Sequence, residues 1–320
     1  MKLFDLTQNK IQATAGLPVH VKNPALALLI LFGLFFAMLM IVSLVMGLMG
    51  DKALTAPGLR IFSVIQDIFV FILPAIVTAM IATRLPATFL RVDAKVNFKT
   101  LFFAVLVLIC SIPAMDFVVA LNEAISLPPA LKPLEDAIRE MEEAARESLS
   151  LIQGGNSVGD LMLSVLIIGV LTGFAEEIFF RGALQRLFRA QKMNPHVAVW
   201  LTALIFSLLH FQFYGFIPRM LLGAYFGYVV WWSGSLWTAV LCHAVNNSIV
   251  VTAEWFNRGD DLSEIASELG NTIAPTPQEI VTIVLSIAVT CLGLIVLRRN
   301  ALRSKKLNCT VNTQTINHEN

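Results

Sequence analysis

The chain has 320 residues, of which 57% are hydrophobic and only 14% are charged. Soluble globular proteins carry roughly 45–50% apolar and about 25% charged residues, so this composition excludes an ordinary soluble domain and indicates a polytopic membrane protein. A formal net charge of +1 gives no reason to expect nucleic acid as a partner.

Residues 1–23 form a polar tail with three lysines. The apolar run that follows is about one membrane span long, too long for the hydrophobic core of a signal peptide, so we expect no cleavable signal. Residues 24–298 form the expected transmembrane domain, with a motif-bearing core at about 158–253. Residues 299–320 form a basic and polar tail.

A helix that crosses a bilayer needs about 20 mostly apolar residues. By this criterion the sequence predicts eight transmembrane helices, over residues 24–50, 61–84, 98–121, 158–181, 197–216, 217–232, 236–253 and 278–298. The break between the fifth and sixth depends on the stretch YGFIP, residues 214–218. The predicted fold class is therefore an all-α polytopic membrane bundle of about eight transmembrane helices.

The distribution of lysine and arginine predicts the orientation of these helices. With the N-terminus inside and eight alternating spans, the inside segments hold sixteen of the 23 basic residues and the outside segments hold seven. Basic residues concentrate in cytoplasmic loops of membrane proteins. Both termini are therefore expected in the cytosol.

Residues 122–157 form an acidic segment that is expected outside the cytosol. Apolar side chains recur at helical spacing over 134–153, which predicts an amphipathic helix. Because anionic lipid would repel its acidic face, we expect this helix to cap the outer surface of the bundle, with solvated acidic residues rather than a site.

Charge appears at the end of the fourth predicted span, in GFAEEIFFRG, residues 173–182. Adjacent helical residues point about 100° apart, so Glu176 and Glu177 face different atoms. Glu177 and Arg181 are four residues apart, the spacing of a helical ion pair. Glu176 is left without a local partner, and a carboxylate in apolar surroundings is suited to act as a general base.

Alternatively, this span ends near Ala175 and all three charges lie in water. Because IFF and ALQRLF continue the helical pattern, we favour a long helix that runs to about Leu187.

Two other spans carry polar side chains at membrane depth. His210 lies in FSLLHF on the fifth span, and His243 and Asn247 share one face of the seventh span in LCHAVNN. Any one of them alone would more often serve packing or interhelical hydrogen bonding. Because intramembrane polar residues tend to line one cavity, we expect them to converge with Glu176 in the cytosolic half or near the membrane centre.

Together these three segments resemble the CPBP family of intramembrane proteases, also called the Abi or CAAX-protease-like family. The family's motifs read EExxxR, FxxxH and HxxxN. The matching residues here are Glu176, Glu177, Arg181, Phe206, His210, His243 and Asn247. The resemblance covers roughly residues 160–250, and the first three spans carry no motif.

The resemblance implies hydrolysis of peptide bonds within the membrane. The expected substrate is a membrane protein or peptide, with or without a lipid, since eukaryotic relatives trim prenylated CAAX proteins. Because the family has bacterial members, the plasma membrane of a bacterium is the expected location.

The resemblance also implies roles for the motif residues. Glu176 would be the general base, and His210 would help to hold the water. His243 and Asn247 would donate hydrogen bonds to the developing oxyanion. The residues that would order the site are Glu177, Arg181 and Phe206.

A metal is the alternative to direct activation of water by a carboxylate. Glu176, His210 and His243 offer ligand atoms that zinc accepts. However, HExxH is absent and no three ligands have a local zinc spacing. We therefore favour a glutamate-activated water without a cofactor, with zinc as the alternative.

A second hypothesis is a non-catalytic or immunity-type membrane protein that binds a peptide or toxin with the same fold. A transporter is disfavoured because no internal repeat is visible. Asp67 and Asp116 lie in predicted spans, and we assign them no role. The GxxxG pattern of Gly223 and Gly227 predicts a close helix contact, within the chain or between protomers.

Overall fold

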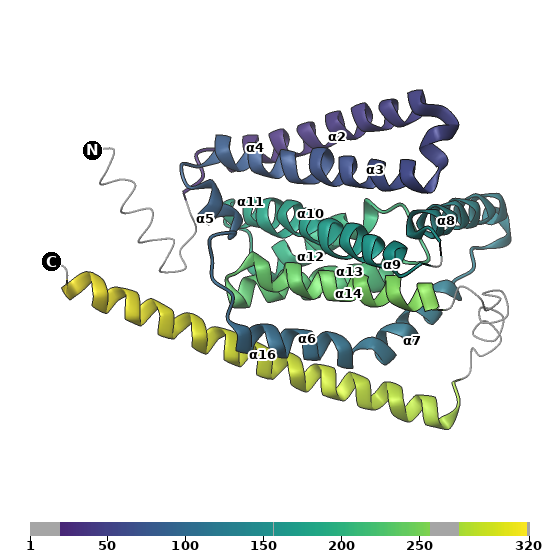
Figure 1. The fold of residues 1–320 in the computed structure, drawn as a ribbon. Helices are drawn as coiled ribbons and strands as arrows, with labels where there is room; N and C mark the ends of the chain where they lie inside the picture. The colour runs from purple at the N-terminus through teal and green to yellow at the C-terminus, as the bar shows by residue number, and fades with distance from the viewer. Residues whose placement is uncertain (1–19, 156, 257–274, 319–320) are drawn as a thin grey trace.

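The computed structural model describes residues 20–155, 157–256 and 275–318, with side chains as far as residue 303. Within these ranges every regular element is helical, which confirms the predicted all-α fold class. The helices form three layers in Figure 1.

The first layer, at the top of Figure 1, is a long hairpin of α2 (Pro24–Met49), η1 (Gly50–Leu54), α3 (Ala56–Gln66), η2 (Asp67–Ile72) and α4 (Leu73–Ala82), followed by the short α5 (Pro86–Leu90). The opposite layer consists of α6 (Phe98–Cys110), α7 (Ile112–Glu123) and α16 (Pro277–His318).

The central layer contains the motif-bearing residues. It consists of α9 (Val158–Ser164), η4 (Val165–Thr172), α10 (Gly173–Glu177), η5 (Ile178–Leu184), α11 (Gln185–Ala190), α12 (Pro195–Leu208), α13 (Phe216–Ser233) and α14 (Leu236–Phe256). At one end of the bundle, η3 (Pro129–Leu131) leads into α8 (Lys132–Gln153).

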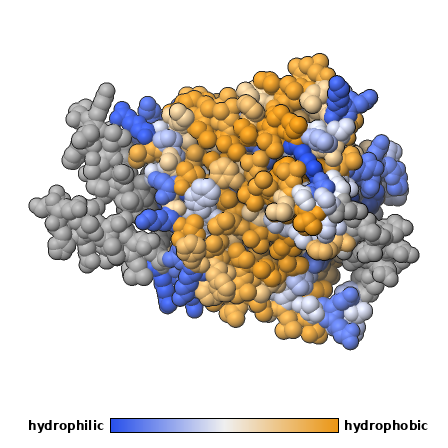
Figure 2. Space-filling model, in the orientation of Figure 1, coloured by the Kyte–Doolittle hydropathy of each residue, from blue (hydrophilic) through white to orange (hydrophobic). Residues whose placement is uncertain are grey.

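Five described helices are long and apolar enough to cross a membrane: Pro24–Leu54, Ala56–Ala82, Val158–Ala190, Leu236–Phe256 and Pro277–Arg303. A sixth is added if α6 and α7, which meet at 46°, form one broken span. The predicted fifth and sixth spans correspond to the shorter α12 and to α13. Figure 2 shows the resulting belt of hydrophobic side chains with hydrophilic residues at both ends. The count of eight spans and the cytosolic termini stay predictions.

The third predicted span is not straight, because it breaks between α6 and α7. Ser111 stands at the junction and donates its hydroxyl proton to the carbonyl of Leu108, at 2.7 Å. Pro113, in the first turn of α7, has no N–H to continue the hydrogen-bond ladder of α6. The predicted span over 98–121 is therefore bent, and the prediction of one uninterrupted helix there is wrong.

The predicted extension of the fourth span is confirmed. It runs without a break from Val158 to Ala190, so the charged residues at 176–181 lie well inside a helix. This helix contains two π-helical stretches, η4 and η5, on either side of α10. Such stretches occur frequently at functional sites.

Small residues bring α14 against the long central helix. A Cβ atom on Gly173 would lie 3.3 Å from the backbone nitrogen of Ala244, and one on Gly169 would lie 2.5 Å from the hydroxyl of Ser248. Each helix therefore presents two small residues four positions apart to the other, an arrangement that lets backbones approach closely. Gly169 and Gly173 form a second GxxxG pattern, which was not among the predicted helix contacts.

Gly223 and Gly227 make their close contact within the chain. A Cβ atom on Gly223 would lie 3.1–3.2 Å from atoms of Phe206, Ala203 and Arg181. One on Gly227 would lie 2.7 Å from the side-chain oxygen of Gln185. The GxxxG pattern of α13 therefore faces α12 and the arginine of the EExxxR motif.

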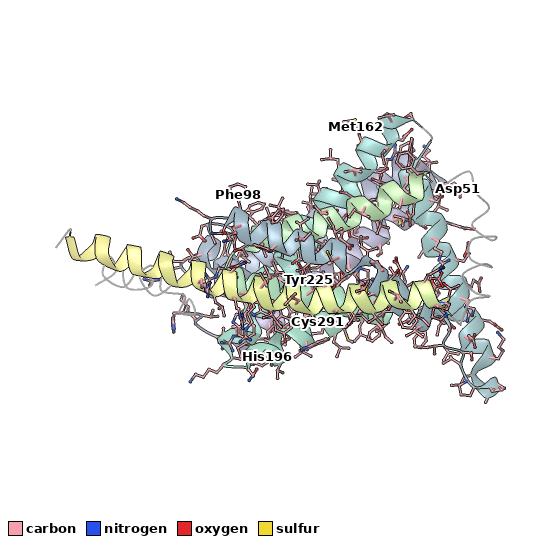
Figure 3. The ribbon with its side chains drawn as sticks, turned by 90° about the horizontal axis from the view of Figure 1, so that it is seen from below. Asp51, Phe98, Met162, His196, Tyr225 and Cys291 are labelled. Carbon is pink, nitrogen blue, oxygen red and sulfur yellow. The ribbon has the colours of Figure 1, made fainter. Side chains whose placement is uncertain are left out.

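The amphipathic helix predicted over 134–153 is confirmed as α8, at the opposite end of the bundle from the last turns of α16 (Figures 1 and 3). The expectation that its acidic residues are solvated is wrong for Glu135 and Glu142, which are buried. Arg139 and the N–H of Leu127 both donate to Glu135, and these hydrogen bonds lower the pKa of its carboxyl.

We expect Gly173→Val to destabilise the protein by about 1–3 kcal/mol, because the added side chain meets the backbone of α14, which cannot turn aside. Denaturant titration of the purified protein in detergent measures this change. The matched control is Gly33→Val on α2, where a Cβ has no neighbour within 4 Å. Equal effects of the two substitutions would contradict the proposed close contact.

Candidate active site

Glu176 lies between two imidazole rings that come from other elements. Its two carboxylate oxygens lie 3.7 Å from Nε2 of His210 and 3.5 Å from Nε2 of His243. Both separations exceed the usual 2.7–3.2 Å of a direct N–H···O bond. The residue is only 8% exposed. The predicted convergence of these three side chains is present in the structure.

The sequence predicted that His210 lies inside the fifth transmembrane helix. The structure places it outside a helix, so this prediction is wrong. Helix α12 ends at Leu208, and His210 belongs to the turn that follows. The chain reverses there through Phe211, whose φ of 54° is in the left-handed region. The Nδ1 atom of His210 lies 2.7 Å from the carbonyl oxygen of Phe206. Because a carbonyl only accepts, Nδ1 carries the proton, and in the neutral ring Nε2 then presents a lone pair toward Glu176.

The loop that carries His210 is held by two buried side chains outside the family motifs. Asn122 at the end of α7 donates to the carbonyl of Phe213 and accepts from the N–H of Ile217, both at 2.9 Å. Glu142 of α8 accepts from the N–H of Tyr214 at 2.7 Å. These hydrogen bonds satisfy loop backbone groups and fix the position of the turn between α12 and α13.

His243 is held between two glutamates. Its Nδ1 atom lies 2.9 Å from Oε1 of Glu177, while its Nε2 faces Glu176. Its ring stacks on Phe226, with centroids 4.7 Å apart and planes at 20°. The prediction that the two glutamates face different atoms is correct, but the atoms belong to the same imidazole. A carboxylate on one ring nitrogen fixes the orientation of the other.

Arg181 is wholly buried and forms the predicted pair with Glu177. Its Nη1 donates to Oε1 of Glu177 at 2.5 Å, and its Nη2 donates to the carbonyl of Gly223 at 2.8 Å. The guanidinium also lies over the ring of Phe206, 4.7 Å from its centroid. Arg181 thus links the glutamate that orients His243 to helix α13 and to the FxxxH motif.

Asn247 lies one turn beyond His243 on α14. Its amide nitrogen donates to the carbonyl of Ile168 at 3.2 Å, and its oxygen accepts from Asn246 at 3.3 Å. These contacts orient the amide and leave its second N–H for another acceptor. The structure shows no direct hydrogen bond between Asn247 and Glu176, His210 or His243.

The two aspartates without an assigned role differ in their surroundings. Asp67 is buried in η2 and accepts from the hydroxyl of Thr172, at 2.8 Å, on the same long helix as Glu176. Asp116 is exposed on α7. Asp67 therefore belongs to the polar interior near the site, and Asp116 does not.

Three side chains of the site carry donor atoms that a metal ion accepts. Glu176, His210 and His243 offer suitable atoms, with both Nε2 atoms facing the carboxylate. However, among the residues that the structure describes, no three His, Cys, Asp or Glu side chains are grouped closely enough to hold a metal ion. Zinc therefore stays the alternative, and the proposed chemistry uses no metal.

Sequence reasoning missed several residues that shape the site, namely Asn122, Glu142, Phe226, Gly169 and Gly173. The two small residues had a usable signal in their GxxxG spacing. Asn122 and Glu142 had no signal in the sequence, because each forms hydrogen bonds with the backbone of a segment more than 70 residues away in the chain.

The residues of the candidate site lie in a segment that matches a known protein family. Residues 158–249 match the family model described as type II CAAX prenyl endopeptidase Rce1-like, which confirms the resemblance to the CPBP family for this segment. The match suggests CAAX-type intramembrane protease activity and supports a protease-type enzyme that acts on a membrane-associated peptide or protein. Helices α2–α8 and α16 lie outside the matched residues.

A curated relative is the uncharacterized protein YpbD of Bacillus subtilis (strain 168). The two sequences are 28% identical over 89 residues, which cover 27% of this chain and 42% of that protein. The chain therefore aligns with less than half of the length of this relative. No solved structure gives a significant match.

We expect Arg181→Met to destabilise the protein by about 3–5 kcal/mol, because it leaves the charge of Glu177 buried without its cation. The double variant Arg181→Met/Glu177→Gln should regain part of this loss, since the buried charge is removed as well. Denaturant titration in detergent measures both. If the double variant is less stable than the single variant, the buried ion pair does not have the proposed role.

Replacing Asn122 with alanine should loosen the His210 loop, because two backbone groups lose their partner. Hydrogen exchange followed by mass spectrometry should show at least tenfold faster exchange across residues 209–217. The matched control is Glu123→Ala, one residue away, whose side chain is half exposed. Unchanged protection of the loop in Asn122→Ala would contradict this assignment.

Proposed function

We propose that this Rce1-like segment makes the chain an intramembrane endopeptidase in which Glu176 activates a water molecule to hydrolyse a peptide bond. The observation that carries the proposal is the position of the Glu176 carboxylate, which faces the Nε2 atoms of His210 and His243 in a largely buried site. A carboxylate and an imidazole on opposite sides of one small volume are suited to hold and deprotonate water.

In the first step, a water molecule donates one hydrogen bond to Glu176 and the other to the lone pair on Nε2 of His210. The water oxygen attacks the carbonyl carbon of the scissile peptide bond. Its proton passes to the Glu176 carboxylate, and the electron pair of the carbonyl double bond moves onto the oxygen. The product of this step is a tetrahedral oxyanion beside a protonated Glu176.

The oxyanion needs donors, and His243 and Asn247 are the proposed ones. His243 already donates from Nδ1 to Glu177, so its Nε2 donates only when both ring nitrogens carry a proton. In that form the positive charges of His243 and Arg181 balance the negative charges of Glu176 and Glu177. The second N–H of Asn247 completes the pair of donors.

In the second step, the oxyanion collapses and the bond between the carbonyl carbon and the amide nitrogen breaks. Protonated Glu176 gives its proton to the departing nitrogen, which leaves as an amine. The other product is a carboxylic acid, and Glu176 returns to its ionised form. Glu177 and Arg181 take no part in proton transfer, since they hold His243 and α13 in place.

The proposed substrate is a membrane-associated protein or peptide. Such a substrate reaches a buried site between apolar helices without leaving the bilayer, and a lipid attached to it is compatible with this route. We place the enzyme in the plasma membrane of a bacterium as part of the same proposal.

Glu176→Gln tests the proposal directly. We expect cleavage of a quenched-fluorescence peptide library in detergent to fall by about 10²–10⁴-fold, because the amide cannot accept the proton of the water. The matched control is Glu143→Gln on the exposed face of α8, which should cleave at the wild-type rate. Thermal unfolding shows whether both variants remain folded.

Three results would overturn this proposal or a part of it. Cleavage that survives Glu176→Gln would remove Glu176 from the mechanism. Loss of wild-type cleavage with a chelator, and recovery with zinc, would replace direct water activation by the metal alternative. If the wild type cleaves nothing and Glu176→Gln leaves the cellular phenotype intact, the non-catalytic binding hypothesis is favoured.

A further inference from the structure

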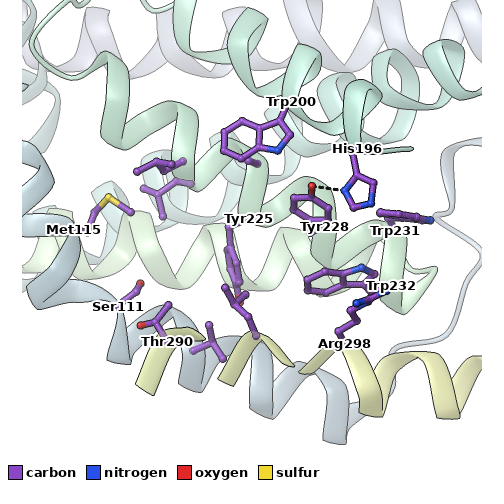
Figure 4. A pocket seen from close by; sticks show the side chains of 15 residues that line it. Ser111, Met115, His196, Trp200, Tyr225, Tyr228, Trp231, Trp232, Thr290 and Arg298 are labelled. Atoms are coloured by element: carbon purple, nitrogen blue, oxygen red, sulfur yellow. Dashed lines mark hydrogen bonds between the residues drawn. The ribbon is translucent and has the colours of Figure 1, made fainter. Parts of the chain in front are cut away.

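A pocket of about 420 Å³ lies on the side of α13 that faces away from the candidate site. Its walls come from α6, α7, α12, α13 and α16, and most of its lining is aliphatic or aromatic. Figure 4 shows Met115 and Ser111 at one end and Trp231, Trp232 and Arg298 at the other. None of the residues assigned to catalysis lines it.

Helix α13 separates this pocket from Glu176. Gly223 and Phe226 contact Arg181 and His243 on one face of the helix. On the other face, Ala224, Tyr225 and Tyr228 line the pocket. A molecule bound in the pocket is therefore kept away from the carboxylate of Glu176. This separation argues for a resident ligand rather than a substrate.

The pocket has the depth of one lipid leaflet. Thr290 and Arg298 both line it from α16 and lie eight residues apart, which corresponds to about 12 Å along a helix. Half of the hydrocarbon core of a bilayer is about 15 Å thick. Tryptophan and tyrosine gather at the Arg298 end, as is typical of residues at a membrane interface.

The interfacial end of the pocket carries positive charge without a protein partner. Arg298 is exposed, and it forms no hydrogen bond or ion pair with any side chain in the described part of the chain. His196, at the same end, has its Nδ1 atom 2.7 Å from the hydroxyl of Tyr228, which leaves Nε2 for another group. A phosphate is the group that an unpaired guanidinium and a ring nitrogen recognise at a membrane surface.

We propose that the pocket binds one anionic phospholipid, with an acyl chain against Tyr225 and Leu294 and its phosphate at Arg298. The aromatic lining suits an apolar chain, and the separation of charged and apolar ends matches the two parts of a lipid. Because the pocket lies between α16 and the rest of the bundle, the bound lipid would also tie the last helix to the central layer.

The test uses tryptophan emission of the full chain reconstituted in vesicles, because three tryptophans line the pocket. Lipids with brominated acyl chains quench nearby indoles. We expect brominated phosphatidylglycerol to quench more strongly than brominated phosphatidylcholine at equal mole fraction. Arg298→Gln should weaken the preference for the anionic lipid about fivefold, by the loss of one basic contact.

The neighbouring Arg299→Gln is the matched control, since it removes the same charge from an exposed residue that does not line the pocket. A second pair of variants tests the apolar part. Thr290→Phe fills the pocket and should reduce quenching by both brominated lipids, whereas Thr282→Phe, on the exposed part of the same helix, should not.

Equal quenching of the wild type by the two lipids, or equal effects of Arg298→Gln and Arg299→Gln, would overturn the proposal. Strong quenching that Thr290→Phe leaves unchanged would show that the lipid lies only at the outer surface, which also contradicts it. None of these quenching measurements depends on peptide cleavage. A wrong lipid-site proposal can therefore be distinguished from a wrong protease proposal.

Discussion

The buried ion pair between Glu177 and Arg181 is the interaction on which the candidate site depends. Two opposite charges without solvent gain stability when further hydrogen bonds accompany the pair. Arg181 also donates to the carbonyl of Gly223 and lies over the ring of Phe206, and Oε1 of Glu177 also faces His243. Nε of Arg181 and Oε2 of Glu177 have no hydrogen-bond partner among the described residues. The pair therefore joins all three sequence motifs and presents His243 to Glu176, which keeps its own carboxylate free of a direct ion pair with arginine.

Close packing of small residues makes this network geometrically feasible. Gly173 lets α14 approach until Glu177 reaches His243, and Gly223 lets α13 approach until its carbonyl reaches Arg181. In a membrane, where apolar contact between helices competes with equally apolar lipid, such close approach is a main source of helix association. The glycines therefore allow the close approach, and the charged residues make their contacts across it.

The all-α class, the long fourth helix, the amphipathic helix over 134–153 and the Glu177–Arg181 pair followed from periodicity and spacing, which are local properties. The position of His210 in a turn, the break at Ser111 and the burial of Glu142 did not. The first and the last depend on contacts between distant segments, such as Asn122 with the loop around Phe213, whereas the break had a local signal in Pro113 that was not used. The contact of both Glu176 and Glu177 with the ring of His243 was also not predictable. Helical angles show that the two glutamates point in different directions, but they do not show which residue of another helix lies between them.

The central claim is that Glu176 activates a water molecule rather than attacking the peptide bond itself. A single turnover in H₂¹⁸O, with enzyme in excess over a cleaved peptide, tests this most directly by mass spectrometry of both product and protein. The account predicts one ¹⁸O atom in the new carboxyl group of the product and none in Glu176. Label incorporated into the Glu176 carboxylate would indicate a covalent acyl intermediate and would contradict the account.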